Sequence, residues 1–362
     1  MSALFVYSIL FVCIFLLYKK RGEHDNRFYW LAAFLLSVLV GARSVSVPDT
    51  SNYLAFFRAI TPGDFSTVGH FSFEIGFQVY THLLKLLSLG SSFIYFTLIS
   101  MTNLALLYWV ARKISPADED CNYLLLLLSY YAFFGFFYNA IVLRAGIAMS
   151  LVMLAVAMCY ERGTVDRRTL LSATAVMALA LSFHLSAVIG LVVLLVFIFS
   201  RPLKFELSML IWLVLVIVLI SHLSPQIIQL LLGTILAFFS LVSDNEFDKY
   251  AYYITELYEL NPVVPNRIIF QFLIGLLFIN VRHADDRYYK LLNVYLVGLF
   301  VSATCYSIEQ LSRATDYFLI FSSWLFYLRF RETYNEKRVF LPLMAILFLQ
   351  VLFFIRIIND AH

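Results

Sequence analysis

Long apolar segments recur along almost the whole chain, and they decide what it can fold into. Most are about 16 to 22 residues long and rich in Leu, Phe, Val and Ala, as in LFVYSILFVCIFLLY and AVIGLVVLLVFIFS. Such runs are longer than buried strands and long enough for a helix to cross a bilayer. Because 62% of the residues are hydrophobic and the mean hydropathy is +0.85, a soluble domain is excluded. We expect an all-α polytopic membrane bundle.

About twelve membrane spans are predicted within one membrane domain over residues 1–362. They cover residues 3–18, 28–44, 91–111, 122–140, 142–160, 169–183, 186–200, 207–223, 267–281, 290–309, 313–328 and 339–357. No basic segment precedes the first run and no small-residue cleavage site follows it, so we expect a retained span and not a signal peptide.

The basic residues predict the orientation of these spans. Eighteen Lys and Arg residues fall in the short loops of one side, and the other eight fall on the opposite side. Because Lys and Arg near span ends stay in the cytoplasm, both termini are expected outside. The outside also receives the two long connections, 45–90 and 224–266. Their amphipathic stretches, 73–89 and 225–243, are expected to lie in the interface or to be re-entrant, since a full crossing would scramble the charge asymmetry.

Several classes of function are disfavoured by the sequence. No basic tract is interleaved with aromatic residues, so nucleic acid is not an expected partner. The four cysteines are scattered without a CxxC pair, which is typical of core thiols and not of disulfides or zinc ligands. Because there is no aspartate-rich metal motif, HExxH, Walker loop or GxSxG, we expect neither a metal nor a cofactor.

Unusual polar residues gather at the outer ends of the predicted spans, and the first group lies between residues 43 and 74. Arg43 and Asp49 flank the end of the second span, and Tyr53 comes one helical turn after Asp49. Asp49 is interpreted either as an N-cap or as a site residue, and Glu74 either as a helix-start signal or as a site carboxylate.

Arg144 and His184 are the most costly of these residues to place near a membrane. Arg144 precedes small residues at the start of a span, so it either faces the bundle interior or snorkels to the interface. His184 lies where one span ends and the next begins. There it either hydrogen-bonds Ser182 or Ser186 or exchanges protons at a rim that water reaches.

Two further arginines complete the set. Arg313 begins the eleventh span, and its spacing allows a pair with Asp316, beside Tyr317. Arg267 follows two prolines at the start of the ninth span and is interpreted first as an interfacial anchor. Together with Arg144 they suit the binding of a lipid-linked diphosphate, because the guanidinium fork matches phosphate oxygens, while a carboxylate or imidazole accepts a proton from an incoming hydroxyl.

The order of these motifs resembles the EpsG-like polysaccharide polymerases, which are grouped with Wzy-type O-antigen polymerases. The resemblance covers roughly residues 45 to 330 and rests on Asp49-x-x-x-Tyr53, FEIGF with Glu74, Arg144 on a small-residue helix, HLSA at 184–187, and Arg313-x-x-x-Tyr317. One departure is that members often have Gln directly after the arginine, where this chain has Ala145.

The resemblance implies a GT-C-like polymerase architecture and an inverting, metal-independent glycosyl transfer at the periplasmic face of a bacterial inner membrane. The donor would be a glycan on undecaprenyl pyrophosphate and the acceptor a lipid-linked repeat unit, with membrane lipid, a chain-length regulator and a flippase as partners. It implies catalytic roles for three residues and substrate-binding roles for seven. The catalytic residues are His184, Asp49 and Glu74, and the substrate-binding residues are Arg144, Arg313, Tyr53, Tyr317, Ser186, Arg43 and Arg267.

Two alternatives stay open. Another lipid-linked sugar transferase, either an O-antigen ligase or a GT-C enzyme, would use similar groups. Ligases are expected to carry a late histidine in a large outer loop, and 224–266 has none. A transporter or flippase for lipid-linked sugars would favour buried charges at mid-membrane and pseudo-symmetric halves, and neither is visible in the sequence.

Overall fold

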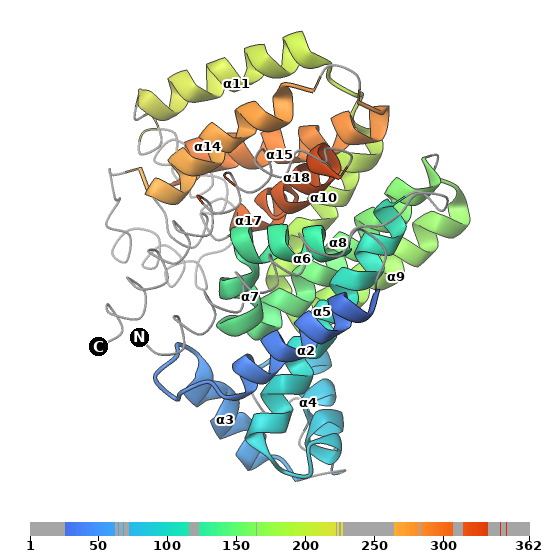
Figure 1. Cartoon of the computed structure of the whole chain (residues 1–362), viewed down its shortest axis with the longest axis vertical. Helices are drawn as coiled ribbons and strands as arrows, with labels where there is room; N and C mark the ends of the chain where they lie inside the picture. The colour runs from blue at the N-terminus through green and yellow to red at the C-terminus, as the bar shows by residue number, and fades with distance from the viewer. Residues whose placement is uncertain are drawn as a thin grey trace, which may run out of the picture. The chain divides into compact units, whose positions relative to one another are not determined.

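The computed structural model describes residues 26–61, 72–115, 123–163, 165–221, 264–281, 284–306 and 314–331, with isolated positions at 64, 68, 223, 226, 341 and 345. Throughout these residues the secondary structure is helical (Figure 1). They form two compact units, one made by residues up to 198 together with those from 322, and one made by 199–321. The all-helical prediction is therefore confirmed for the described part of the chain.

The helices follow the apolar segments. The first unit contains α2 (Asn26–Gly41), α3 (Thr50–Ala59), α4 (Ile75–Leu87), α5 (Ser92–Ile114), α6 (Tyr123–Tyr130), α7 (Phe136–Ala140), α8 (Leu143–Arg162), α9 (Arg167–Phe183), nearly all of α10 (Val188–Phe199) and α18 (Ser322–Phe330). The second contains α11 (Phe205–Ile220), α14 (Asn266–Ile279), α15 (Asp286–Cys305) and α17 (Asp316–Leu319).

Two predicted spans differ from a regular helix. Within 122–140, a π-helical turn at Tyr131–Gly135 separates α6 from α7. The predicted span 313–328 is not one helix, because α17 ends at Leu319 and α18 begins only at Ser322. The predicted spans 3–18 and 339–357 and the amphipathic stretch 225–243 lie outside the described residues, apart from single positions.

Four described helical segments are long and apolar enough to cross a membrane. They are Ser92–Ile114, Tyr123–Ala140, Leu143–Arg162 and Asp286–Cys305. Shorter apolar helices occupy Asn26–Gly41, Leu185–Phe199, Phe205–Ile220 and Asn266–Ile279. These helices are consistent with a helical membrane protein, while the predicted total of twelve spans is not reached among them.

The core of the first unit is built around α8, which packs against α5 and α9. The buried side of α8 is rich in small residues, which allow close helix approach. At Gly146 a Cβ atom would come 1.9 Å from the carbonyl oxygen of Tyr138, so only glycine fits where α8 passes the end of α7.

Buried polar side chains hold the same helices in register. Asn139 donates to Ser100 at 2.8 Å, and Asn103 donates to Asn139 at 3.0 Å and to Tyr130 at 3.1 Å. Ser150 of α8 donates in turn to Asn103 at 2.5 Å. Because buried amides and hydroxyls are costly without partners, this network favours one arrangement of the four helical segments that supply it.

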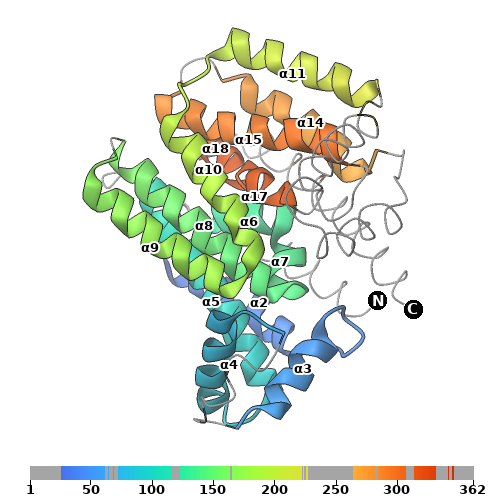
Figure 2. The ribbon, with the colours of Figure 1, turned by 180° about the vertical axis from the view of Figure 1, so that it is seen from behind.

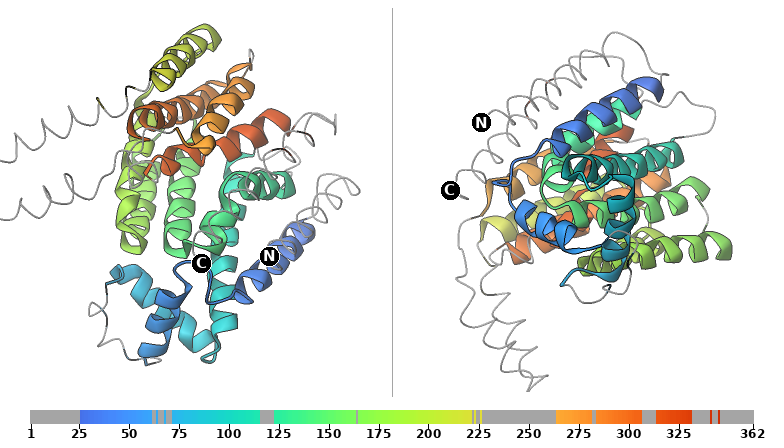
Figure 3. Two further views of the ribbon diagram at one scale, coloured as in Figure 1. Left: turned by 90° about the vertical axis from the view of Figure 1, so that its left-hand side faces the viewer. Right: turned by 90° about the horizontal axis from the view of Figure 1, so that it is seen from below.

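Helices α3 and α4 cover one end of the first unit, the lower end in Figures 1 and 2 and the end nearest the viewer on the right of Figure 3. With 10 and 13 residues, they are about 15 and 20 Å long, too short to cross a bilayer. The ammonium of Lys85 on α4 donates to the carbonyl oxygens of Phe57, Arg58 and Ile60, so it ties the end of α3 to α4.

The opposite end of this unit carries basic residues. Arg112 and Lys113 end α5, Arg162 ends α8, and Arg167 begins α9. An ion pair of 2.7 Å between Lys113 and Glu161 joins the ends of α5 and α8. The first unit therefore has one end covered by α3 and α4 and another rich in Lys and Arg.

The second unit packs α11, α14 and α15 against one another. Trp212 Nε1 donates to the carbonyl oxygen of Phe272 at 3.0 Å, which joins α11 to α14. The Tyr295 hydroxyl donates to the carbonyl oxygen of Gln271 at 2.5 Å and joins α15 to α14.

Candidate functional site

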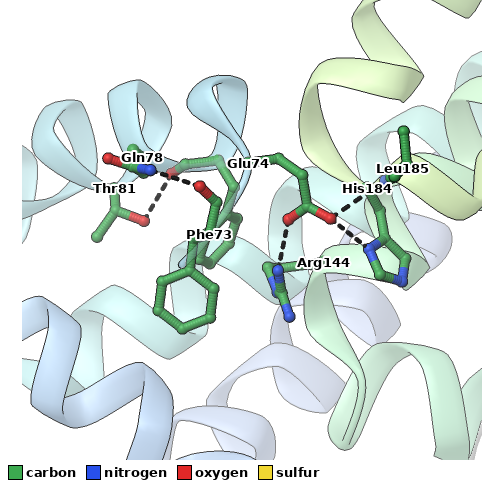
Figure 4. A network of polar contacts seen from close by, with 8 residues as sticks. Phe73, Glu74, Gln78, Thr81, Arg144, His184 and Leu185 are labelled. Atoms are coloured by element: carbon green, nitrogen blue, oxygen red, sulfur yellow. Dashed lines mark hydrogen bonds and ion pairs between the residues drawn. The ribbon is translucent and has the colours of Figure 1, made fainter. Parts of the chain in front are cut away.

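Glu74 occupies the N-cap position of α4, but its side chain does not cap the helix. Its backbone is extended, with φ −64° and ψ 146°, and its carbonyl oxygen accepts the first helical hydrogen bond, from Gln78 N–H. Among the described residues, no backbone N–H of α4 is capped by the carboxylate. The side chain is directed instead toward α8 and α9 (Figure 4).

The carboxylate of Glu74 joins three groups from distant parts of the chain. One oxygen accepts from the Arg144 guanidinium. The other lies 2.8 Å from His184 Nδ1 and accepts from Leu185 N–H at 3.1 Å. Figure 4 shows Glu74 between the arginine and the histidine. One carboxylate therefore positions both Arg144 and His184, which the sequence singled out as polar residues at the ends of apolar segments.

These contacts fix which nitrogen of the His184 ring carries the proton when the imidazole is neutral. Burial raises the pKa of Glu74, but the hydrogen bonds of His184 and of the backbone, including Leu185 N–H, together with the charge of Arg144, lower it to about 2. An ionised carboxylate only accepts hydrogen bonds, so His184 Nδ1 must carry the proton. In the neutral imidazole Nε2 then keeps a lone pair, which makes it a hydrogen-bond acceptor and a base.

The backbone at His184 holds the imidazole in place. Helix α9 ends at Phe183, and His184 is extended, with φ −157° and ψ 123°. Its N–H donates to Ala180 and its carbonyl oxygen accepts from Ala187, each at 3.0 Å. The predicted position of His184 between two helices is thus confirmed. In the described part of the chain, however, the imidazole contacts the side chain of Glu74 and not that of Ser182 or Ser186. Ser182 donates to the carbonyl oxygen of Leu179, and Ser186 lies in the following 3₁₀ turn, Leu185–Ala187.

Arg144 is the second residue of α8 and lies beside aromatic rings from the connection 45–90. Its guanidinium carbon lies 4.5 Å from the centre of the Phe73 ring and 5.9 Å from that of Phe77. Such contacts stabilise a cation that is partly removed from water. Arg144 therefore faces the interior of this end of the unit, one of the two alternatives left by the sequence.

Tyr53 on α3 completes this aromatic cluster. Its ring stacks on Phe73, with centres 6.0 Å apart, and is almost fully buried. Burial raises the pKa of its hydroxyl, while the charge of Arg144 and hydrogen bonds from that arginine oppose the rise and the charge of Asp49 adds to it. Tyr53 is thus a neutral hydroxyl beside the guanidinium, and it links α3 to the start of α8.

A close contact between α4 and α9 sets the distance from Glu74 to His184. A Cβ atom on Gly76 would lie 2.2 Å from Ser182 Oγ and 2.7 Å from the Ser182 carbonyl oxygen. Only glycine therefore allows the two backbones to approach so closely. Glu74 lies two residues before Gly76, and His184 lies two residues after Ser182. The close approach of the two backbones therefore brings the carboxylate to the imidazole.

The three charged or titratable side chains remain open to solvent in part. Their exposed fractions are 22% for Glu74, 23% for Arg144 and 27% for His184. Solvent therefore reaches all three side chains in the folded protein.

Asp49 and Arg43 lie in the turn before α3. Asp49 is exposed, immediately precedes the helix and adopts a left-handed backbone conformation with φ 63°, which Asp tolerates better than most residues. The N-cap position is as predicted, but no capping hydrogen bond from its side chain is found in the described chain. Arg43 Nε donates to Thr50 Oγ1 at 2.8 Å, and its guanidinium lies over Phe96, so it holds this turn against α5.

Three predicted site residues belong to the other part of the chain. Arg267 on α14 forms an ion pair of 3.0 Å with Asp316 of α17, whose side chain is fully buried. The expected partner of Asp316, Arg313, lies outside the described residues. Tyr317 is almost completely buried in the second unit.

The structure adds two groups that the sequence pattern did not single out. Phe73 lies directly before Glu74 in SFEIGF and covers Arg144, and Leu185 N–H bonds the Glu74 carboxylate. An aromatic residue beside an isolated carboxylate was the available signal for Phe73. No side-chain pattern could have indicated a backbone N–H.

Comparisons with known proteins identify the family of the chain. No curated protein and no solved structure matches the chain. A family model described as the EpsG family matches residues 26–362, which include every residue of the site. The chain therefore belongs to the EpsG family.

Proposed function

We propose that this protein is a glycan polymerase of the membrane, which transfers a growing oligosaccharide from a polyprenyl diphosphate to the end of a second lipid-linked repeat unit. The family supports a polymerase-type role. The observation that carries the chemistry is the Glu74 carboxylate, which holds His184 by Nδ1 and Arg144 by its guanidinium at one partly exposed site.

His184 acts as the general base in this proposal. Its Nε2 takes the proton of the acceptor hydroxyl as the hydroxyl oxygen bonds to the anomeric carbon of the donor sugar. The bond between that carbon and the diphosphate oxygen breaks, and the diphosphate leaves with the electron pair and an added negative charge. Attack from the face opposite the leaving group inverts the anomeric centre. Glu74 keeps the proton on Nδ1 and stabilises the imidazolium that forms, as carboxylates do for histidine bases.

Arg144 supplies positive charge to the departing diphosphate. A guanidinium has five N–H donors, and the ion pair with Glu74 uses only the Nη1 nitrogen of Arg144. The proposed base step starts from a neutral imidazole beside the Arg144 cation and the Glu74 anion, so the net charge of the three groups is then about zero. When His184 takes the proton, the site becomes positive just as the leaving group becomes more negative, which stabilises the transition state.

The proposed site faces the outside of a bacterial inner membrane. It lies at the end of the first unit covered by α3 and α4, and the opposite end carries Arg112, Lys113, Arg162 and Arg167. Basic residues near span ends mark the cytoplasmic side, so this separation supports an outward site. Asp49 and Ser186 stay candidates for positioning the acceptor, and Arg43, Arg267, Arg313 and Tyr317 stay candidates for substrate binding.

Deletion of the gene tests the proposal most directly. Extracted glycans are separated on a gel, and strains that express wild-type protein or the His184→Ala variant are compared at equal protein levels. The proposal requires a ladder that collapses to single repeats in the deletion strain and with His184→Ala, and that returns with wild type. An intact ladder in the deletion strain contradicts it, and loss of all lipid-linked glycan assigns the protein to an earlier transferase or transport step.

A further inference from the structure

Two strongly exposed apolar side chains bracket the polar site. Ile75 directly follows Glu74 and is 63% exposed, and Leu185 directly follows His184 and is 71% exposed. The two segments are tied together, because Leu185 N–H donates to the Glu74 carboxylate. Apolar surface therefore borders the charged groups on both of the helical segments that carry them.

Each of these residues begins a longer apolar stripe. On α4, Ile75, Leu83, Leu86 and Leu87 are exposed, while Phe77, Gln78 and Thr81 form the buried side. Beyond Leu185, the exposed residues of α10 are Val188, Val192, Leu195 and Phe199, at steps of three and four residues. This spacing places them on one face of the helix. In an apolar helix of a membrane protein, such an exposed face contacts lipid hydrocarbon.

The lipid-facing stripe of α10 thus runs up to the residue next to His184. A ligand that fills both surfaces must combine an anionic head, for Arg144, with a long apolar chain, for the stripe. We infer that Ile75 and Leu185 form the edge over which the prenyl chain of the diphosphate substrate passes from the bilayer into the site. This inference rests on the proposed function for the identity of the lipid.

In this arrangement, different residues bind the polar head and the apolar chain of the substrate. Glu74, Arg144 and His184 act on the polar head of the substrate. Every donor has the same diphosphate group in this head. Ile75 and Leu185 contact only hydrocarbon, so they contribute to affinity for long-chain substrates and not to the chemical step.

Binding of undecaprenyl diphosphate to the purified full-length protein in nanodiscs tests the edge. Ile75→Ser and Leu185→Ser are each expected to weaken binding about tenfold, because each removes one large apolar contact. Leu171→Ser is the matched control. Its side chain is 61% exposed and lies about 18 Å along α9 from the site end, on neither of the two stripes, so its binding is expected to equal that of wild type. Unchanged binding by both edge variants overturns the inference.

A photoreactive side chain gives a second readout that does not depend on weakened binding. Placed at position 75 or 185, it is expected to crosslink to undecaprenyl diphosphate, whereas at position 171 it is expected to label bulk phospholipid only. Equal labelling by the diphosphate lipid at all three positions contradicts a specific edge.

The two proposals fail in different ways. If deletion of the gene collapses the glycan ladder but the edge variants bind the lipid as wild type does, the polymerase stands and the edge assignment is wrong. If the edge variants lose lipid binding while the deletion strain keeps its ladder, the lipid site stands and the polymerase is wrong.

Discussion

Glu74 and Arg144, which are 70 positions apart in the chain, form an ion pair at the end of the first helical unit. The same carboxylate contacts His184, a further 40 residues on. Glu74 is thus the residue that links Arg144 to His184.

Replacement of Glu74 by Gln should lower the rate of glycan elongation by about 100-fold or more, because a neutral amide neither fixes the Nδ1 proton nor stabilises the imidazolium. Elongation in isolated membranes measures the rate. Glu74→Asp keeps the charge with a shorter side chain and should retain part of the activity. Equal rates for wild type and the Gln variant would exclude this role.

Replacement of His184 by Ala should lower elongation by about 10²–10⁴-fold, the usual contribution of a general base. Added imidazole should restore part of the rate, since the cleared space beside Glu74 admits it. Ser182→Ala is the matched control, because in the described part of the chain the Ser182 hydroxyl donates to the carbonyl oxygen of Leu179 and not to His184 or Glu74. If imidazole does not restore the His184→Ala variant and binding is intact, the histidine is not a base.

Arg144→Lys should keep the charge and lose the planar fork, so the ion pair with Glu74 survives while contact with diphosphate oxygens weakens. We expect kcat to fall about tenfold or more, with little change in thermal stability, whereas Arg144→Gln should lose both. Kinetics with the purified enzyme and a melting curve separate the two effects. Wild-type kcat in the Lys variant would argue against a role in stabilising the leaving group.

Gly76→Ala should push α4 away from α9, since the new methyl group would meet Ser182 Oγ and its carbonyl oxygen. Overpacking of this kind costs about 1–3 kcal/mol. Activity should fall more than stability does, because Glu74 and His184 separate while the bundle of α5, α8 and α9 remains. A cysteine pair at positions 74 and 184 reports the separation by its crosslinking rate, and unchanged crosslinking would sink the prediction.

The contribution of Glu74 to the stability of the protein should change with pH only in acid. The pKa of this carboxyl is lowered from 4.5 to about 2 in the folded protein, so between these values the unfolded chain binds more protons. The stability that Glu74 contributes is therefore complete above about pH 4.5 and lost as the pH falls toward 2. The difference in melting temperature between wild type and Glu74→Gln should stay constant from pH 8 to 5 and shrink below that. A difference that changes near pH 7 would assign the titration to another group.

Much of the site was visible in the sequence because the membrane makes polar residues conspicuous. Glu74, Arg144 and His184 stood out as polar groups at the ends of apolar segments, and the loop charges predicted that those ends share one side. For Asp316 the spacing suggested a pair with Arg313, which lies outside the described residues, and the structure adds an ion pair with Arg267 from another helix. Spacing along one helix describes only neighbours within a turn or so, and it is silent about the other helices that compete for the same carboxylate.

The sequence by itself determined that the chain is helical and apolar, where most helices begin and end, and which few residues do not suit hydrocarbon. These properties depend on local periodicity and composition, which each segment carries alone. Only the tertiary structure decided that Glu74 serves Arg144 and His184 at once and that Ile75 and Leu185 border them. That pairing requires α4 to lie against α9 at Gly76 and Phe73 to cover α8, and such contacts arise from packing between segments that are far apart in the chain.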